Sequence, residues 1–246
     1  MSWQADHIFP FSAALSTGTE TTHDVHVGGD GPPILILQEL PGIGPETLTL
    51  AERLNAAGFR IYLPHLFGTF GKLTPKRNLL RLFCIRREFQ MFWKGRQSPI
   101  ADWMRALARD IQSREGGPGL GVIGMCLTGS FALTLMAEDA VLGGVASQPA
   151  LPVFGGDKLH MSTDDITAAR SGMARKGPGL AMRYQGDRMA PACLMRSLET
   201  AFGCHLNTVE FPGRDHSLLT LDFLEPAYQR VEAYFRDRFA QAASSG

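Results

Sequence analysis

The feature that most constrains the fold of this 246-residue chain is a regular alternation of short apolar runs with amphipathic helical patterns. PPILILQ (32–38) and GLGVIGM (119–125) are typical of fully buried strands, and a stretch with helical spacing follows each of them. Strands and helices alternate in this way when crossover helices cover both faces of a mostly parallel sheet. We therefore expect an α/β fold with a doubly wound, mostly parallel sheet and helices on both faces.

The same patterns predict where the individual elements lie. Pro45 suits the first turn of a helix and Gly58 suits its end, while Ser98 and Pro99 open a second helix whose apolar residues fall at helical spacing. The predicted strands are 23–29 at a sheet edge, 32–38, 59–64, 119–125, 140–148, 179–185 and 205–212. The predicted helices are 45–57, 76–94, 98–111, 130–138, 164–175, 190–203 and a last one from about 222, with residues 240–246 frayed.

We expect a single domain over residues 1–246, because no repeat, low-complexity tract or linker suggests a boundary. The basic and aromatic segment at about 66–97 is the hardest to place, and we predict that it is largely helical. Its arginines admit two interpretations, a nucleic-acid patch or the solvated face of a helix. The second is favoured because the chain as a whole is neutral.

Composition excludes several classes of partner. Lysine plus arginine and aspartate plus glutamate both number 24, so the totals show no excess of positive charge for nucleic acid or an anionic membrane. The N-terminus lacks the pattern of a secretory signal, and no run of about 18 apolar residues occurs. We expect a cytoplasmic monomer or small homo-oligomer. The four cysteines are widely spaced without a C-x-x-C pair, which predicts reduced thiols, no zinc site and no cofactor.

Four chemically related residues directly follow predicted strands. They are Glu39, Cys126, Asp187 and His216. Because ligands of such sheets gather at the carboxyl ends of the strands, we expect these side chains to meet. A sharp turn from strand to helix can present Cys126 as a nucleophile, with little bulk at Gly124 and Gly129 to obstruct it.

A thiol with its usual pKa near 8.5 is only slightly ionised at neutral pH, so a nucleophilic Cys126 needs a base. His216 can accept the proton, and Asp187 can hold the imidazole in the required tautomer. The order of nucleophile, acid and histidine is that of an α/β-hydrolase. Each residue also has a structural alternative: Cys126 as an ordinary buried thiol, and the other three as turn or surface residues.

Other residues compete for these roles. Asp215 adjoins His216 in sequence, but neighbouring side chains usually point apart, and Asp157, Asp164 and Asp165 lie in a predicted loop or helix start. His65 also follows a predicted strand, where it could line a pocket or serve the structure alone.

Four segments resemble corresponding segments of the dienelactone hydrolase family of the α/β-hydrolase superfamily. They are the stretch from ILQELPG to LPHLFG, then GVIGMCLTGSFAL, YQGDRMAP and FPGRDHS. The resemblance runs from about residue 23 to the last helix and is weakest over 66–97. It implies Cys126 as nucleophile, His216 as base and Asp187 as orienting acid. It also implies Glu39 as a carboxylate that contacts the resting thiol, with the backbone N–H groups of Leu127 and Leu40 as the oxyanion hole.

The chain departs from the family pattern at two positions. Thr128 stands where the family has the first of two glycines after the nucleophile turn. Thr220 stands four residues after His216, where lactone-cleaving members carry an arginine that binds the substrate carboxylate. Candidate replacements lie in the divergent segment: Arg81, Arg86, Arg87 and Arg96.

The sequence thus predicts a hydrolase without a cofactor that cleaves small carboxylic esters or lactones through an acyl-thioester on Cys126, with dienelactone itself disfavoured as substrate. Two alternatives remain open. One is a ligand-binding or sensor protein on the same fold that does not hydrolyse its ligand, and the other is an acyltransferase that shares the acyl-cysteine step.

Overall fold

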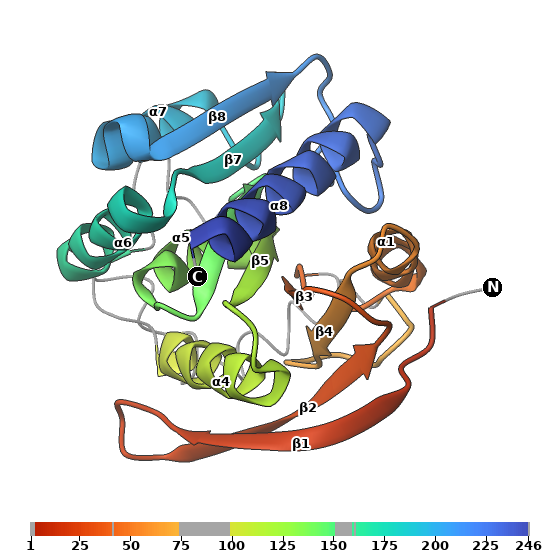
Figure 1. Ribbon diagram of the computed structural model, residues 1–246. Coiled ribbons are helices and arrows are strands. Elements are labelled where there is room, and N and C mark those ends of the chain that lie inside the picture. Colours follow the sequence, from red (N-terminus) through yellow and green to blue (C-terminus); the bar gives the residue numbers. More distant parts are fainter. Residues whose placement is uncertain (1–2, 41, 74–98, 151–158, 160, 246) are drawn as a thin grey trace.

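The computed structural model describes residues 3–40, 42–73, 99–150, 159 and 161–245 (Figure 1). These residues form a sheet of eight strands in the order β1-β2-β4-β3-β5-β6-β7-β8. The strands are β1 (His7–Ala14), β2 (Glu20–Gly28), β3 (Pro33–Leu37), β4 (Arg60–Pro64), β5 (Leu120–Met125), β6 (Val141–Ser147), β7 (Gly179–Tyr184) and β8 (Leu206–Phe211). Strands β3 to β8 pair in parallel, and β2 pairs antiparallel with both β1 and β4. The predicted mostly parallel sheet is confirmed.

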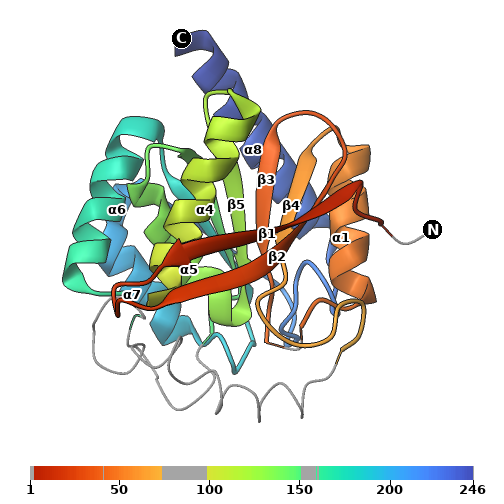
Figure 2. The same ribbon diagram turned by 90° about the horizontal axis from the view of Figure 1, so that it is seen from below.

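Helices cover both faces of this sheet, as Figures 1 and 2 show. Helices α1 (Pro45–Ala56) and α8 (Glu225–Ser245) pack on one face. The other face is covered by α4 (Pro99–Glu115), α5 (Gly129–Thr134), α6 (Thr163–Lys176) and α7 (Ala192–Phe202). Each face therefore has its own apolar core, and the strands between them are buried on both sides. This burial explains why β3 and β5 are nearly continuous apolar runs.

Local sequence accounts for where the flanking helices begin and pack. Pro45 occupies the first turn of α1, and Gly58 follows its end with a φ of +88°, a conformation that favours glycine. In α4 the fully buried side chains include Ile100, Trp103 and Leu107. These residues belong to the apolar stripe predicted from the sequence.

Helix α8 approaches the sheet closely because glycines on the strands leave room for its aromatic rings. A Cβ atom at Gly121 would lie 2.5 Å from the Phe235 ring. The Tyr234 hydroxyl accepts a hydrogen bond from the N–H of Gly144 at 3.2 Å and donates one to the Pro178 carbonyl oxygen at 2.9 Å. This helix is therefore fixed to the centre of the sheet by both packing and hydrogen bonds.

The structure differs from the sequence prediction at the N-terminal end of the sheet. We took residues 23–29 as an edge strand, but β2 lies inside the sheet and the unpredicted β1 forms that edge. The alternation of apolar and polar residues in β1 is hard to recognise in the sequence, because Pro10 interrupts it and the side chains on its inner face are only half-buried. Phe9 and Phe11 nevertheless pack against the core, and Trp103 donates a hydrogen bond to the Phe11 carbonyl oxygen at 3.2 Å.

Two further boundaries differ at the C-terminal end. The last helix begins at Glu225, three residues after the predicted start at Asp222, because Asp222 serves a turn described below. It then continues to Ser245, through most of the stretch predicted to be frayed. The helix predicted at 76–94 lies outside the described residues.

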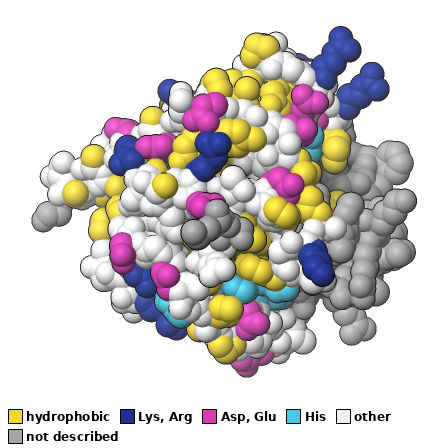
Figure 3. All heavy atoms as spheres, turned by 90° about the vertical axis from the view of Figure 1, so that its right-hand side faces the viewer, with side chains coloured by type: hydrophobic (Ala, Val, Ile, Leu, Met, Phe, Trp, Pro, Cys, Tyr) yellow, Lys and Arg dark blue, Asp and Glu magenta, His cyan; other side chains and the backbone are white. Residues whose placement is uncertain are grey.

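The described helices and one face of the surface bear on the expectation of a neutral protein. None of the described helices is both long and apolar enough to cross a membrane. On the face shown in Figure 3, acidic and basic side chains are interspersed with apolar ones. The charge distribution on that face agrees with the neutral composition.

Candidate active site

Cys126 lies on a sharp turn between β5 and the helices that follow it. Residues Cys126–Thr128 form a single 3₁₀ turn directly after the last residue of the strand, and α5 begins at Gly129. Cys126 has a φ of +52°, a left-handed conformation that a residue with a side chain rarely adopts. Such backbone strain, which costs about 1–3 kcal/mol, is typical of functional sites. The side chain is 5% exposed, at the end of a central strand of the sheet.

The two glycines that flank the turn are required by close backbone contacts. A Cβ atom at Gly124 would lie 2.2 Å from the Thr128 carbonyl oxygen, and one at Gly129 would lie 2.8 Å from Cα of Pro149. Neither neighbour is a flexible side-chain end that could move aside. The expectation that both positions exclude bulk is therefore confirmed.

Replacement of Gly124 by alanine is expected to destabilise the protein by about 2–3 kcal/mol, because the backbone of the turn would have to shift. The measurement is the free energy of unfolding in urea. Gly117→Ala is the matched control, since no atom lies within 4 Å of its added Cβ and its φ is not in the left-handed region. Equal stability of the two variants would contradict this account of the turn.

Thr128 replaces a family glycine and contributes to the turn through its hydroxyl group. Its side chain is fully buried. The Oγ1 atom accepts a hydrogen bond from the N–H of Met125 at 3.0 Å, and its single proton can go to the Met125 carbonyl oxygen at 3.0 Å or to the Leu37 carbonyl oxygen at 3.2 Å. The hydroxyl thus contacts the ends of β5 and β3, which are neighbours in the sheet. These contacts give the threonine at this position a structural role.

Asp187 and His216 meet at the same edge of the sheet, although 29 residues separate them in sequence. Asp187 Oδ2 lies 2.7 Å from Nδ1 of His216. The other carboxylate oxygen accepts the N–H groups of Met189 and Ala190, which fixes the orientation of the side chain. Burial alone would raise the pKa of Asp187, but the hydrogen bonds from His216 and from these two amides hold it below its ordinary value.

Nδ1 of the His216 imidazole faces Asp187, while the buried Nε2 makes no hydrogen bond within the described residues, and the Cys126 thiol lies close enough to affect the ring. Burial alone would lower the pKa of His216. The hydrogen bond and charge of Asp187, together with the nearby Cys126 side chain, instead raise the pKa of His216 to about 10. The protonated imidazole is therefore stabilised at neutral pH. Asp187 and His216 thus form the predicted acid–histidine pair, and Cys126 lies next to it.

Two residues that the sequence analysis did not single out hold the loops of this site. Arg183, on β7, is 2% exposed and donates to the carbonyl oxygens of Gln185 and Ala190 at 3.1 and 2.9 Å, so it shapes the loop that carries Asp187. Asp222 accepts the backbone N–H of His216 at 3.1 Å. Arg183 could have been recognised from the sequence, because it is the charged residue in an otherwise apolar predicted strand. Asp222 could not be recognised because it precedes a helix, where aspartate is common.

Glu39 is buried at the end of β3, with an exposed fraction of 1%. Its carboxylate accepts hydrogen bonds from Thr220 at 2.6 Å and from Ser217 at 3.2 Å. Burial raises the pKa of Glu39 above its ordinary value, and the hydrogen bonds from these two hydroxyl groups and the nearby charge of His216 offset only part of that effect. The structure thus brings Glu39 to the site, beside the loop that carries His216.

The two backbone N–H groups expected to form an oxyanion hole belong to residues that follow neighbouring strands. Leu127 follows Cys126 at the end of β5, and Leu40 follows Glu39 just after β3. Strands β3 and β5 pair in parallel, so both residues lie at the same edge of the sheet. Their role in binding an oxyanion is a proposal taken up below.

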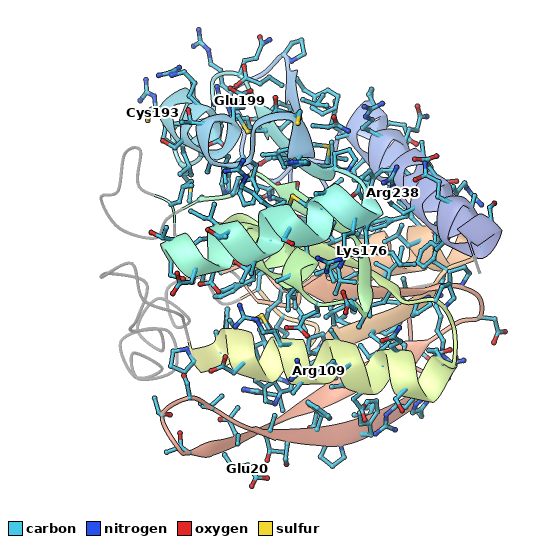
Figure 4. All side chains as sticks on the ribbon, turned by 60° about the vertical axis from the view of Figure 1, so that its left-hand side comes forward. Glu20, Arg109, Lys176, Cys193, Glu199 and Arg238 are labelled. Carbon is cyan, nitrogen blue, oxygen red and sulfur yellow. The ribbon has the colours of Figure 1, made fainter. Side chains whose placement is uncertain are left out.

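Other histidines and cysteines of the described chain lie elsewhere. The rings of His65 and Phe70 are 5.8 Å apart, and His65 also lies beside His26 at the end of β4. Cys193 lies on α7, as Figure 4 shows, and Cys204 is exposed. Within the described ranges, no group of three or more His, Cys, Asp or Glu side chains is arranged to hold a metal ion.

The sheet order, the flanking helices and the position of these side chains define an α/β-hydrolase fold. The model of the dienelactone hydrolase family matches residues 21–219. The chain therefore belongs to the dienelactone hydrolase family. No curated protein sequence matches it.

Solved structures support the fold. A putative dienelactone hydrolase from Klebsiella pneumoniae superposes with a TM-score of 0.64 at 16% identity, covering 96% of this chain and 100% of that one. An esterase from Exiguobacterium antarcticum gives a TM-score of 0.57 at 14% identity over 93% of this chain and 100% of its own. An α/β serine hydrolase without a lid from Xanthomonas campestris gives 0.59 at 12% identity, covering 97% and 98%.

Proposed function

We propose that this protein hydrolyses carboxylic esters or lactones, with Cys126 as the nucleophile, His216 as the base and Asp187 as the orienting acid. The observation that carries the proposal is the strained turn that holds Cys126 beside a histidine paired with a buried aspartate at 2.7 Å. Membership of the dienelactone hydrolase family supports the reaction class, and one of the similar solved structures is an esterase.

The proposed reaction proceeds through a thioester. The proton of the Cys126 thiol passes to Nε2 of His216, and the sulfur attacks the carbonyl carbon of the substrate. The N–H groups of Leu127 and Leu40 donate to the oxyanion that forms, a contribution typically worth about 3 kcal/mol per donor. The carbon–oxygen bond then breaks, and the alkoxide leaves with the proton from His216. Asp187 keeps the proton-bearing Nδ1 in place throughout.

Water completes the cycle by cleaving the thioester. His216 accepts a proton from water while the oxygen attacks the thioester carbonyl, and it returns that proton to the departing sulfur. The products are the carboxylic acid, the alcohol and the free thiol. No group is oxidised or reduced, and water and the ester are the only reactants.

Mass spectrometry of a single turnover tests this proposal. Excess enzyme is mixed with p-nitrophenyl acetate, quenched at intervals and digested, so that acetylation can be followed at each cysteine. We expect an adduct of one acetyl group on Cys126 that forms as nitrophenol is released and then decays. A persistent adduct would indicate a binding protein or sensor, and faster decay with transfer of the acetyl group to an added alcohol would indicate an acyltransferase. Absence of the adduct during turnover would contradict the nucleophile.

Uncharged acyl groups are expected to be preferred over acyl groups that carry a carboxylate. The described ionisable side chains around the imidazole include three carboxylates, those of Glu39, Asp187 and Asp222. We expect p-nitrophenyl butyrate to show a kcat/KM about tenfold above that of mono-p-nitrophenyl succinate at low salt. A higher value for the succinate would reveal a cation at the site and would direct attention to Arg81, Arg86, Arg87 and Arg96.

A further inference from the structure

The carboxylate of Glu39 is fixed by two hydroxyl groups from one loop. Thr220 donates to Oε1 at 2.6 Å, and Ser217 donates to Oε2 at 3.2 Å. All three side chains are nearly inaccessible to solvent, with exposed fractions of 1% for Glu39 and 4% for each hydroxyl residue. A carboxylate buried in this way stays ionised only if hydrogen bonds and charges compensate for the lost water.

The groups that face Glu39 come from the loop after β8. His216 favours the ionised carboxylate, while the carboxylate of Asp222 disfavours it. The carboxylate of Asp222 itself accepts hydrogen bonds from the backbone N–H groups of His216 and Ser217, at 3.1 and 2.9 Å. The loop therefore binds Glu39 through its side chains and Asp222 through its backbone. Among the described groups that affect Glu39, His216 is the one that carries a positive charge when protonated.

We propose that Thr220 is a positioning residue, which together with Ser217 holds Glu39 as a second, fixed counter-charge to the protonated imidazole of His216. This inference rests on the proposed function, since it assumes that His216 carries the proton taken from Cys126. Both oxygens of Glu39 are engaged by hydroxyl groups of the described chain, so the carboxylate is oriented toward that loop. Glu39 then stabilises the ion pair electrostatically and takes no proton from the thiol.

The chemical nature of the side chain at position 220 has a physical consequence under this proposal. An arginine at that position would add a positive charge beside Glu39, whereas a hydroxyl group orients the carboxylate without neutralising it. When Glu39 is ionised, its negative charge therefore acts on the imidazole without being neutralised by the residue at position 220. Thr220 is needed for the direction of the carboxylate and for keeping it ionised, and it does not have to contact the substrate.

The first test measures the charge directly by NMR, without any substrate. With ¹⁵N-labelled histidine, the His216 signal is assigned by its absence in His216→Gln, and its titration is followed in the wild type and in Glu39→Gln. We expect the titration midpoint of His216 to fall by about half a unit or more in Glu39→Gln, because a negative charge near the imidazole is lost. An unchanged midpoint would overturn the counter-charge role.

The second test isolates Thr220. Thr220→Val keeps the shape of the side chain and removes its hydroxyl group, whereas Thr220→Ser keeps the hydroxyl group. Loss of the 2.6 Å hydrogen bond raises the pKa of Glu39, so the acidic limb of the kcat/KM profile should move to higher pH by about one unit in Thr220→Val. Thr220→Ser should keep the wild-type profile. The proposal would be overturned if the pH profile of kcat/KM in Thr220→Val matched that of the wild type. It would also be overturned if the profile of Thr220→Ser shifted as far as that of Thr220→Val.

A third variant guards against a folding defect in Thr220→Val. Ser217→Ala removes the longer of the two hydrogen bonds, so the same limb should move in the same direction by a smaller amount. No movement in this variant, with an unfolding midpoint equal to that of the wild type, would count against the proposal. Failure of the proposed function is recognised separately, because it would appear as a missing acetyl adduct on Cys126 while the NMR result stands on its own.

Discussion

Cys126→Ala should reduce kcat for a small activated ester by at least about 10⁴-fold, the scale on which the loss of a nucleophile acts in enzymes of this reaction type. The thiol is the atom that forms the covalent bond, and no other described cysteine lies at the carboxyl end of a central strand. The variant should fold, since a cysteine that is 5% exposed and packed against apolar neighbours can be replaced by alanine with a modest loss of packing. The measurement is the initial rate of p-nitrophenyl acetate hydrolysis.

The control for this result is Cys204→Ala, which removes an exposed thiol and should leave the rate unchanged. Both variants need to be purified from a host free of background esterase. Activity within tenfold of the wild type in Cys126→Ala would contradict the mechanism, because the remaining groups cannot form a thioester. Cys126→Ser would then show whether a hydroxyl group can serve at the same strained position.

Asp187→Asn is expected to lower kcat/KM by about 10³- to 10⁴-fold while keeping the shape of the side chain. The amide can present its NH₂ group to Nδ1 of His216, which would place the imidazole proton on the nitrogen that faces Cys126. In the wild type the hydrogen bond and charge of Asp187 help to raise the pKa of His216 to about 10, against the effect of burial. The pKa of His216 should therefore fall in this variant.

The measurement combines the pH dependence of kcat/KM with the NMR titration of His216. Asp215→Asn is the matched control, because it removes the carboxylate next to His216 in sequence but not the one bonded to the imidazole. We expect that control to retain activity within about twofold. Equal losses in the two variants would show that general charge near the loop, and not the 2.7 Å contact, carries the effect.

The parts of the fold that the sequence predicted are those fixed by local pattern. The buried strands β3 and β5 are apolar throughout, and α4 carries its apolar residues on one stripe, so single segments contain enough information. The meeting of Asp187 with His216 was also predictable, because the carboxyl ends of parallel strands share one edge. The role of Cys126 as nucleophile remains a prediction.

The remaining features depend on contacts between segments far apart in the sequence. Strand β1 is recognisable only through its pairing with β2 and its packing on Trp103. The partners of Glu39 lie 178 and 181 residues away, and no local pattern marks a serine or threonine as one of them. The resemblance to the family implies that Glu39 contacts the resting thiol. The hydrogen bonds described for Glu39 go to Ser217 and Thr220.

The arrangement of the strands also determines when this site can first exist during folding. Glu39, Cys126, Asp187 and His216 follow β3, β5, β7 and β8, so no hairpin or single crossover unit contains more than a part of them. Contacts between such distant segments form late, since the entropy of closing long loops opposes them. In a refolding experiment, the NMR signal of the His216 imidazole bonded to Asp187 should therefore appear only when the sheet is complete. We expect it later than the recovery of the helical circular dichroism signal.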